Sequence, residues 1–227
     1  MNYLAIGLII IIIVILYYVY YYLTNNSLTA GLQDLKSQVS VSYEKLINPN
    51  SLTYSYQCWL YISSPTSVQT QIFYRKSSGA SNNEFEVDIS GQSLDLKAGQ
   101  GNATAPVQIM NITNQFPIQK WTYLVVNVYN MKTFEAYING KLAKTVNISN
   151  INVIPSFKTS TLYIGNAALS GYVTKFIRLE KTLDAKTVWN NYLSGNGITS
   201  YFSSFMPYGL NMSISKGEEV QRIVNVF

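Results

Sequence analysis

The N-terminal stretch Tyr3–Leu23 contains no charged side chain and almost no polar one. About 20 apolar residues, each rising roughly 1.5 Å along a helix, match the roughly 30 Å hydrocarbon core of a bilayer. The sequence therefore predicts that residues 1–23 form one transmembrane helix. The end of this helix carries tyrosines, whose amphipathic rings suit the membrane–water interface: Tyr17, Tyr18, Tyr20, Tyr21 and Tyr22.

A cleaved signal peptide is the main alternative for this stretch, and its sequence argues against cleavage. No Lys or Arg precedes the apolar run. The run also exceeds the usual length of about 7–15 residues, and no small-x-small cleavage site follows it closely. We therefore expect an uncleaved, single-pass membrane anchor with the lipid bilayer as one partner of the chain.

The orientation of the anchor is less strongly determined. Lys36 and Lys45 follow the span while no basic residue precedes it, which weakly favours a cytosol-facing C-terminal domain. Asn-x-Ser/Thr sequons leave a lumenal domain open as the alternative, but in a chain so rich in Asn, Ser and Thr they are expected by chance. The sequons begin at Asn25, Asn102, Asn111, Asn147 and Asn211.

Histidine is absent from the whole chain, and cysteine occurs once, at Cys58. This composition excludes Ser-His-Asp and Cys-His catalysis and every metal site that needs an imidazole. Cys58 lies in an alternating apolar pattern, which predicts a small buried side chain. The net charge of +5 is spread over single Lys and Arg residues, and the longest basic run is Arg75-Lys76. We therefore expect no nucleic-acid partner.

Residues 24–50 form a polar connector, and residues 51–227 a folded domain. Within the connector, Leu32, Leu35 and Val39 lie on one side of a helix, which predicts a short helix over Gly31–Leu46. From Leu52 onward the apolar period becomes two, as in strands. The candidate strands are 52–62, 71–76, 83–90, 94–97, 107–112, 121–129, 133–138, 141–146, 162–164, 172–179, 210–215 and 220–226.

Turn and cap signals complete this prediction. Asn139-Gly140 joins two of the candidate strands and is a strong signal for a tight hairpin. A short helix is expected near residues 183–194, capped by Thr182 or Asp184 and ended by Gly195. The tail is expected to form a further hairpin around Lys216-Gly217-Glu218. Many short strands separated by turns indicate an all-β, antiparallel two-sheet sandwich.

The order of these motifs resembles the laminin-G-like, concanavalin A-like jelly-roll family over about Leu52–Gly197. The resemblance implies two packed antiparallel sheets that bind glycans or proteins, in some relatives with calcium, and that hydrolyse glycans in others. An N-terminal anchor before such a domain also resembles membrane proteins of large eukaryotic DNA viruses. The matching segments are 56–62, 121–126, 134–142, 162–166, 171–178 and the closing helix with Leu183, Val188 and Tyr192.

The best enzymatic candidate is the triplet Glu84, Glu86 and Asp88, which strand alternation would place on one face. Paired carboxylates are what glycoside hydrolysis requires. The glucanase relatives carry two glutamates flanking an aspartate, however, and the order here departs from that pattern. A solvated polar strand face is the alternative that we favour, so we predict no enzymatic activity, no catalytic residue and no cofactor.

A calcium site would need several oxygen ligands that converge on one ion. Oxygen ligands are available on separate segments, but no compact acidic loop appears, so we predict no metal site. The tryptophans Trp59, Trp121 and Trp189 all lie in apolar patterns and are expected in the core. The possible calcium ligands are Asp88, Asp95, Asn102 and Asn166.

The sequence thus leaves three functional hypotheses. The first is a membrane-tethered structural or interaction protein, such as a viral minor capsid protein or a membrane–capsid linking protein. Its partners would be other structural proteins, and its place the virion inner membrane facing the capsid. The second is a membrane-bound lectin that binds glycans, and the third an anchored glycoside hydrolase.

Overall fold

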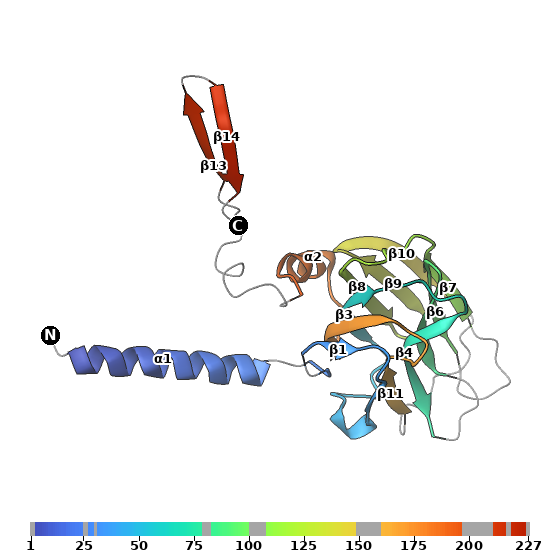
Figure 1. The fold of residues 1–227 in the computed structure, drawn as a ribbon. Helices are drawn as coiled ribbons and strands as arrows, with labels where there is room; N and C mark the ends of the chain where they lie inside the picture. The colour runs from blue at the N-terminus through green and yellow to red at the C-terminus, as the bar shows by residue number, and fades with distance from the viewer. Residues whose placement is uncertain are drawn as a thin grey trace.

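A computed structural model describes residues 3–24, 27–29, 31–78, 83–99, 108–148, 160–196, 211–216 and 219–225. Two six-stranded sheets pack face to face (Figure 1), and every strand pair is antiparallel. The predicted all-β two-sheet sandwich is therefore confirmed. Sheet A contains, in spatial order, β1 (Gln33–Asp34), β12 (Gly171–Leu179), β3 (Tyr54–Ile62), β8 (Thr122–Tyr129), β9 (Thr133–Ile138) and β10 (Lys141–Asn147). Sheet B contains β2 (Val39–Val41), β11 (Ser160–Ile164), β4 (Thr70–Ser77), β5 (Phe85–Ser90), β6 (Ser93–Ala98) and β7 (Gln108–Thr113).

The core lies between the two sheets and follows the two-residue period of the sequence. Alternate residues of each strand enter it, such as Tyr56, Cys58 and Leu60 of β3 and Val87 of β5. Aromatic rings fill much of the space, with Tyr56 packed against Phe73 at a centroid distance of 5.4 Å. Cys58 is a buried free thiol whose pKa is raised by burial, as its apolar pattern predicts.

The predicted helix over Gly31–Leu46 is wrong. Instead, β1 extends one edge of sheet A, β2 extends one edge of sheet B, and a short 3-10 helix, η1 (Tyr43–Lys45), follows. The Leu35 amide donates to the Gly171 carbonyl at 3.0 Å, a bond that only a distant strand can supply. Much of the predicted connector is therefore part of the sandwich.

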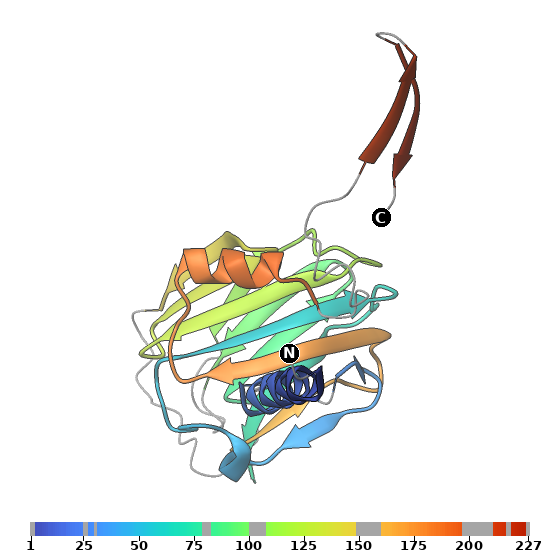
Figure 2. The ribbon, with the colours of Figure 1, turned by 90° about the vertical axis from the view of Figure 1, so that its left-hand side faces the viewer.

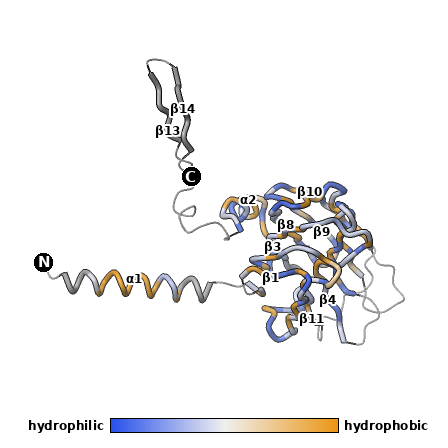
Figure 3. The backbone as a smooth tube through the Cα atoms, in the orientation of Figure 1, coloured by the Kyte–Doolittle hydropathy of each residue, from blue (hydrophilic) through white to orange (hydrophobic). Residues whose placement is uncertain are grey.

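Helix α1 (Tyr3–Thr24) precedes the sandwich and extends away from it (Figures 1 and 3). Its described side chains from Leu8 to Val19 are between 47% and 64% exposed. Among the described residues, no helix is both long and apolar enough to cross a membrane. The membrane anchor over residues 1–23 therefore stays a prediction.

The predicted turn, helix cap and tail hairpin agree with the structure. Asn139 and Gly140 have φ of 50° and 80° and join β9 to β10 in a hairpin. Helix α2 (Ala185–Leu193) begins after Asp184, whose carboxylate accepts from the Thr187 amide at 3.0 Å. The tail forms a hairpin of β13 (Asn211–Lys216) and β14 (Glu219–Asn225).

Figure 2 shows α2 lying across the outer side of sheet A. There Val188 packs with Trp59 and Tyr123 in a second apolar cluster, separate from the core between the sheets. The expectation that all three tryptophans are buried holds for Trp59, whereas Trp121 is only partly buried and Trp189 is 39% exposed. Only one side of α2 packs on the sheet. The helical spacing of its apolar residues did not show which of them would lie on that side.

Candidate functional site

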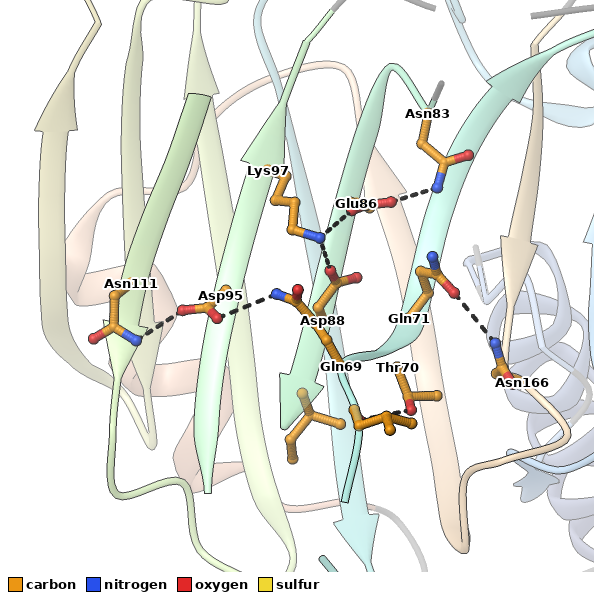
Figure 4. A network of polar contacts seen from close by, with 12 residues as sticks. Gln69, Thr70, Gln71, Asn83, Glu86, Asp88, Asp95, Lys97, Asn111 and Asn166 are labelled. Carbon is orange, nitrogen blue, oxygen red and sulfur yellow. Dashed lines mark hydrogen bonds and ion pairs between the residues drawn. The ribbon is translucent and has the colours of Figure 1, made fainter. Parts of the chain in front are cut away.

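The outer side of sheet B carries neighbouring polar side chains that form separate hydrogen-bonded groups, here together called the polar face (Figure 4). It arises from alternation, because Phe85, Val87 and Ile89 enter the core and direct the side chains between them outward. Strand register then brings polar residues of neighbouring strands into line. The polar face consists of Gln71, Tyr74, Glu86, Asp88, Asp95, Lys97, Asn111, Tyr163 and Asn166.

Lys97 on β6 is the centre of the polar face. Its ammonium lies 2.7 Å from Glu86 Oε1 and 2.5 Å from Asp88 Oδ2. Asn83 donates a further hydrogen bond to Glu86 Oε2. The side chain of Asp88 is only 1% exposed, against 17% for Lys97. Glu86 and Asp88 are therefore held as one ion-paired group beneath the surface.

The pKa values of the two carboxyl groups shift in opposite directions, although both groups contact the Lys97 ammonium. Burial, reinforced by the nearby charge of Glu86, raises the pKa of Asp88 to about 6. Burial also acts to raise the pKa of Glu86, but hydrogen bonds from Lys97 and Asn83 outweigh it and lower that pKa. Glu86 is thus the carboxylate that stays charged, and Asp88 the one that gains a proton first.

Glu84 does not join this pair, so the expectation that three carboxylates share one strand face is wrong. Regular alternation begins only at Phe85, where β5 starts. The Glu84 carboxylate accepts from the Ser77 hydroxyl. Burial raises the pKa of Glu84, and this effect outweighs the lowering by Ser77 and by the charge of Arg75. Arg75 is fully buried and Glu84 is 2% exposed. Glu84 therefore belongs to the buried side of sheet B and not to the polar face.

The possible calcium ligands are brought together only in part. Asp95 stands directly opposite Asp88 in the strand register, but its oxygens accept from Asn111 at 2.7 Å and Gln69 at 3.4 Å. Asn166 donates to Gln71 at 3.3 Å. Asn102 lies outside the described residues. Among the residues that are described, no group of three or more acidic or thiol side chains is arranged to hold a metal ion.

Two tyrosines add an aromatic platform beside the carboxylates. Tyr74 on β4 and Tyr163 on β11 are directly paired, and their rings stack at 4.9 Å with an interplanar angle of 19°. Tyr74 is also the register neighbour of Glu86. Sequence reasoning missed both tyrosines and Lys97, because their importance depends on which strands are neighbours. The alternation within each strand was the one signal available.

This arrangement offers hydrogen bonds and a flat ring surface to a partner. It offers less to acid–base catalysis, because the single Lys97 ammonium bonds to both carboxylates and Asp88 is closed to solvent. A general acid needs direct contact with the atom that it protonates. The geometry of the described residues therefore favours recognition over bond cleavage.

The two facing sheets and the helix that closes on sheet A define the chain as a concanavalin A-like jelly roll. Residues 34–199 match the laminin G family model described as the concanavalin A-like lectin/glucanases superfamily. The chain belongs to this superfamily. No curated protein sequence matches it significantly.

Solved structures with a similar fold include binding domains of botulinum neurotoxins. The binding domain of botulinum neurotoxin DC in complex with rat synaptotagmin II is 19% identical, with a TM-score of 0.56, over 69% of this chain and 40% of that one. The serotype D ligand binding domain in complex with N-acetylneuraminic acid is 16% identical, with a TM-score of 0.55, over 71% and 41%. This chain therefore spans about two fifths of the length of those chains, and at such identities the likeness shows the fold alone.

Proposed function

We propose that this chain is a membrane-tethered interaction protein, with α1 as its anchor and the sandwich as its binding domain. The specific form that we propose links a viral inner membrane to the capsid, as a minor capsid or membrane–capsid linking protein. The sandwich would face the cytosol and bind neighbouring structural proteins. A short joint between α1 and the sandwich is the observation that carries this proposal.

The joint leaves little freedom between the two parts. Helix α1 ends at Thr24, and Ser27 already forms a bridge with Ile177 of β12. The amide of Leu28 then donates to the Phe176 carbonyl at 2.6 Å. Three residues span at most about 11 Å, so a bilayer that holds α1 would also hold the sandwich at its surface. Such a tether suits a partner layered directly against the membrane.

The anchor itself is supported by the apolar character of α1. Its described side chains are exposed along the whole run from Leu8 to Val19, a surface that water solvates poorly and lipid solvates well. We expect the full-length protein to stay with membranes during alkaline carbonate extraction. Extraction of the wild-type protein into the supernatant would refute the anchor.

A charge in the helix gives a matched test. Arg near a helix centre costs about 2.5–3.5 kcal/mol in membrane insertion. The double variant Ile12→Arg/Val14→Arg should therefore pass into the supernatant. Leu32→Arg, at an exposed position outside the helix, should remain in the pellet.

A second candidate function is a membrane-bound lectin, favoured by the stacked pair Tyr74–Tyr163 beside the hydrogen-bonding groups of the polar face. Aromatic faces pack against sugar rings while carboxylates and amides bind hydroxyls. On a glycan array, a lectin of this kind should lose binding in the Tyr74→Ala/Tyr163→Ala double variant. Tyr172→Ala on sheet A, at a 41% exposed side chain, serves as the control.

We propose further that Glu86 and Asp88 are structural and that the protein is not an enzyme. The support is their shared ion pair with Lys97. Purified protein should show no turnover of β-glucan substrates. Turnover by the wild type that disappears in Glu86→Gln would establish the hydrolase instead.

A further inference from the structure

A cavity of about 170 Å³ lies on the opposite side of the sandwich from the polar face, between sheet A and the C-terminal end of α2. A hydrocarbon cavity of about 150 Å³ holds a benzene ring, so this one has room for a single ring with a substituent. Its lining includes Gln57, Trp59, Tyr123, Lys175, Asn191 and Gly195.

The cavity depends on a β-bulge in β12. Thr174 pairs with Trp59 and Ile177 pairs with Gln57, so two residues of β12 stand opposite the single residue Cys58. Lys175, one of the two, has a φ of 49°, a left-handed conformation that costs a non-glycine residue roughly 1 kcal/mol or more. The Lys175 side chain reaches the turn that follows α2, where its ammonium donates to the Gly195 carbonyl at 2.8 Å.

The polar wall of the cavity is held in place by hydrogen bonds. Gln57 is only 8% exposed, and its Oε1 accepts from both the Tyr123 hydroxyl and Asn191 Nδ2. Because Asn191 belongs to α2 and Gln57 to β3, these bonds fix the helix over the sheet. A ligand would therefore meet groups that are already oriented.

The other wall is aromatic. Trp59 lies 5.2 Å from the Tyr123 ring and stacks on Tyr192 at 5.7 Å. Trp59 is 7% exposed and Tyr123 3%, and both line the cavity. Because both rings are nearly covered, this wall offers a ligand ring an apolar contact at the exposed edge of Trp59 and not a whole aromatic face.

The charge of the lining selects the ligand. Lys175 is the one charged side chain among the described lining residues, and no carboxylate is among them. An ammonium has three hydrogens to donate, and the Gly195 carbonyl accepts one of them. The Lys97 ammonium on sheet B differs, because two carboxylates already neutralise it.

We propose that this cavity binds a small molecule with a carboxylate on a six-membered ring. The carboxylate would accept from Lys175, and the ring would contact the exposed edge of Trp59 and the side chain of Ile177. This site goes beyond the proposed function and does not depend on it, since the cavity and the polar face lie on opposite sheets.

The test uses full-length protein in detergent, titrated calorimetrically with four probes. Benzoate and glucuronate carry the carboxylate on an aromatic and on a pyranose ring, and benzamide and glucose are their uncharged counterparts. We expect one of the acids to bind more tightly than its counterpart, and the acid that binds identifies the ring. Equal affinity of acid and counterpart, or no binding by either acid, would overturn the proposal.

Variants locate the binding. Lys175→Gln should weaken the binding acid about ten- to a hundredfold, as expected for losing a hydrogen bond to a charged group. Lys186→Gln removes the same charge from the exposed side of α2 and should change the affinity less than about twofold. If Lys175→Gln fails to fold, Asn191→Asp serves instead, because a carboxylate in the lining should repel the acid. Unchanged affinity in whichever of these variants folds would contradict the proposal.

Discussion

Lys97 is the residue on which the polar face depends, because its ammonium is shared by Glu86 and Asp88. Removing one partner of a buried ion pair leaves an uncompensated charge and costs about 3–5 kcal/mol. Lys97 keeps 17% exposure, so we expect Lys97→Met to lower the free energy of unfolding by roughly 2–3 kcal/mol. Chemical denaturation measures this change. Lys141→Met on the exposed strand β10 is the control, and an equal loss there would contradict the assignment.

Asp88 gives the polar face a pH dependence. Its pKa in the folded protein is about 6, against an ordinary value of 3.8. Between these values the folded state binds more protons than the unfolded state, so the contribution of Asp88 to stability falls as pH rises from about 4 to 6. Glu86, with its lowered pKa, contributes oppositely and only below about pH 4.5. We expect Asp88→Asn to flatten the stability profile between pH 4 and 6, as followed by the denaturation midpoint. An unchanged slope would contradict the raised pKa.

At the residue scale, the sequence predicts which side chains are buried better than it predicts which side chains contact one another. Alternation correctly assigns Phe85, Val87 and Ile89 to the core, because the two-residue period is local. It cannot show that Lys97 meets Glu86, since the β5–β6 register is a property of two strands. It also misplaces Glu84, because the position at which β5 begins is not evident from the residue pattern.

Among the structural elements, the turn after β11 joins the former connector to the sandwich. Gly165 has a φ of 92°, and a Cβ there would lie 2.5 Å from the Leu35 carbonyl oxygen. Gly91 has a φ of 59° with no atom within 4 Å. Gly91→Ala should therefore cost only the left-handed backbone strain, about 1 kcal/mol. Gly165→Ala should cost about 1–3 kcal/mol more, because the backbone of Leu35 has to move. Thermal unfolding measures both losses. Equal losses would mean that the Leu35 backbone makes room for the added Cβ at no cost, which would contradict the prediction.

The elements that the sequence predicts correctly are those with local causes. The Asn139-Gly140 turn and the Asp184 cap each need only neighbouring residues. The expected helix over residues 31–46 fails because β1 and β2 are stabilised by distant partners, β12 and β11. Two and three residues long, these strands carry too short a pattern to recognise without their neighbours.

For the whole molecule, the orientation across the membrane can be tested at a sequon. Asn147 lies on the exposed strand β10, whereas the Asn111 amide donates to Asp95 and Ser93. With a cytosol-facing sandwich, expression with microsomes should leave Asn147 without glycan. A version forced into the lumen by a cleavable signal sequence is the control, and its mobility shift should fall in Asn147→Gln. A glycan at Asn147 in the unmodified chain would place the sandwich in the lumen and favour the lectin.

Site-specific crosslinking in the native membrane tests the central claim most directly. Cys58 is the single cysteine of the chain and is buried, so a cysteine introduced at an exposed site can carry a photocrosslinker without a competing thiol. Ile109 on β7, the register neighbour of Lys97, and Leu142 on β10 are suitable positions, 63% and 54% exposed. We predict that the membrane-bound protein crosslinks to a neighbouring structural protein from at least one of these positions. Recovery of only uncrosslinked monomer from both positions would contradict the account.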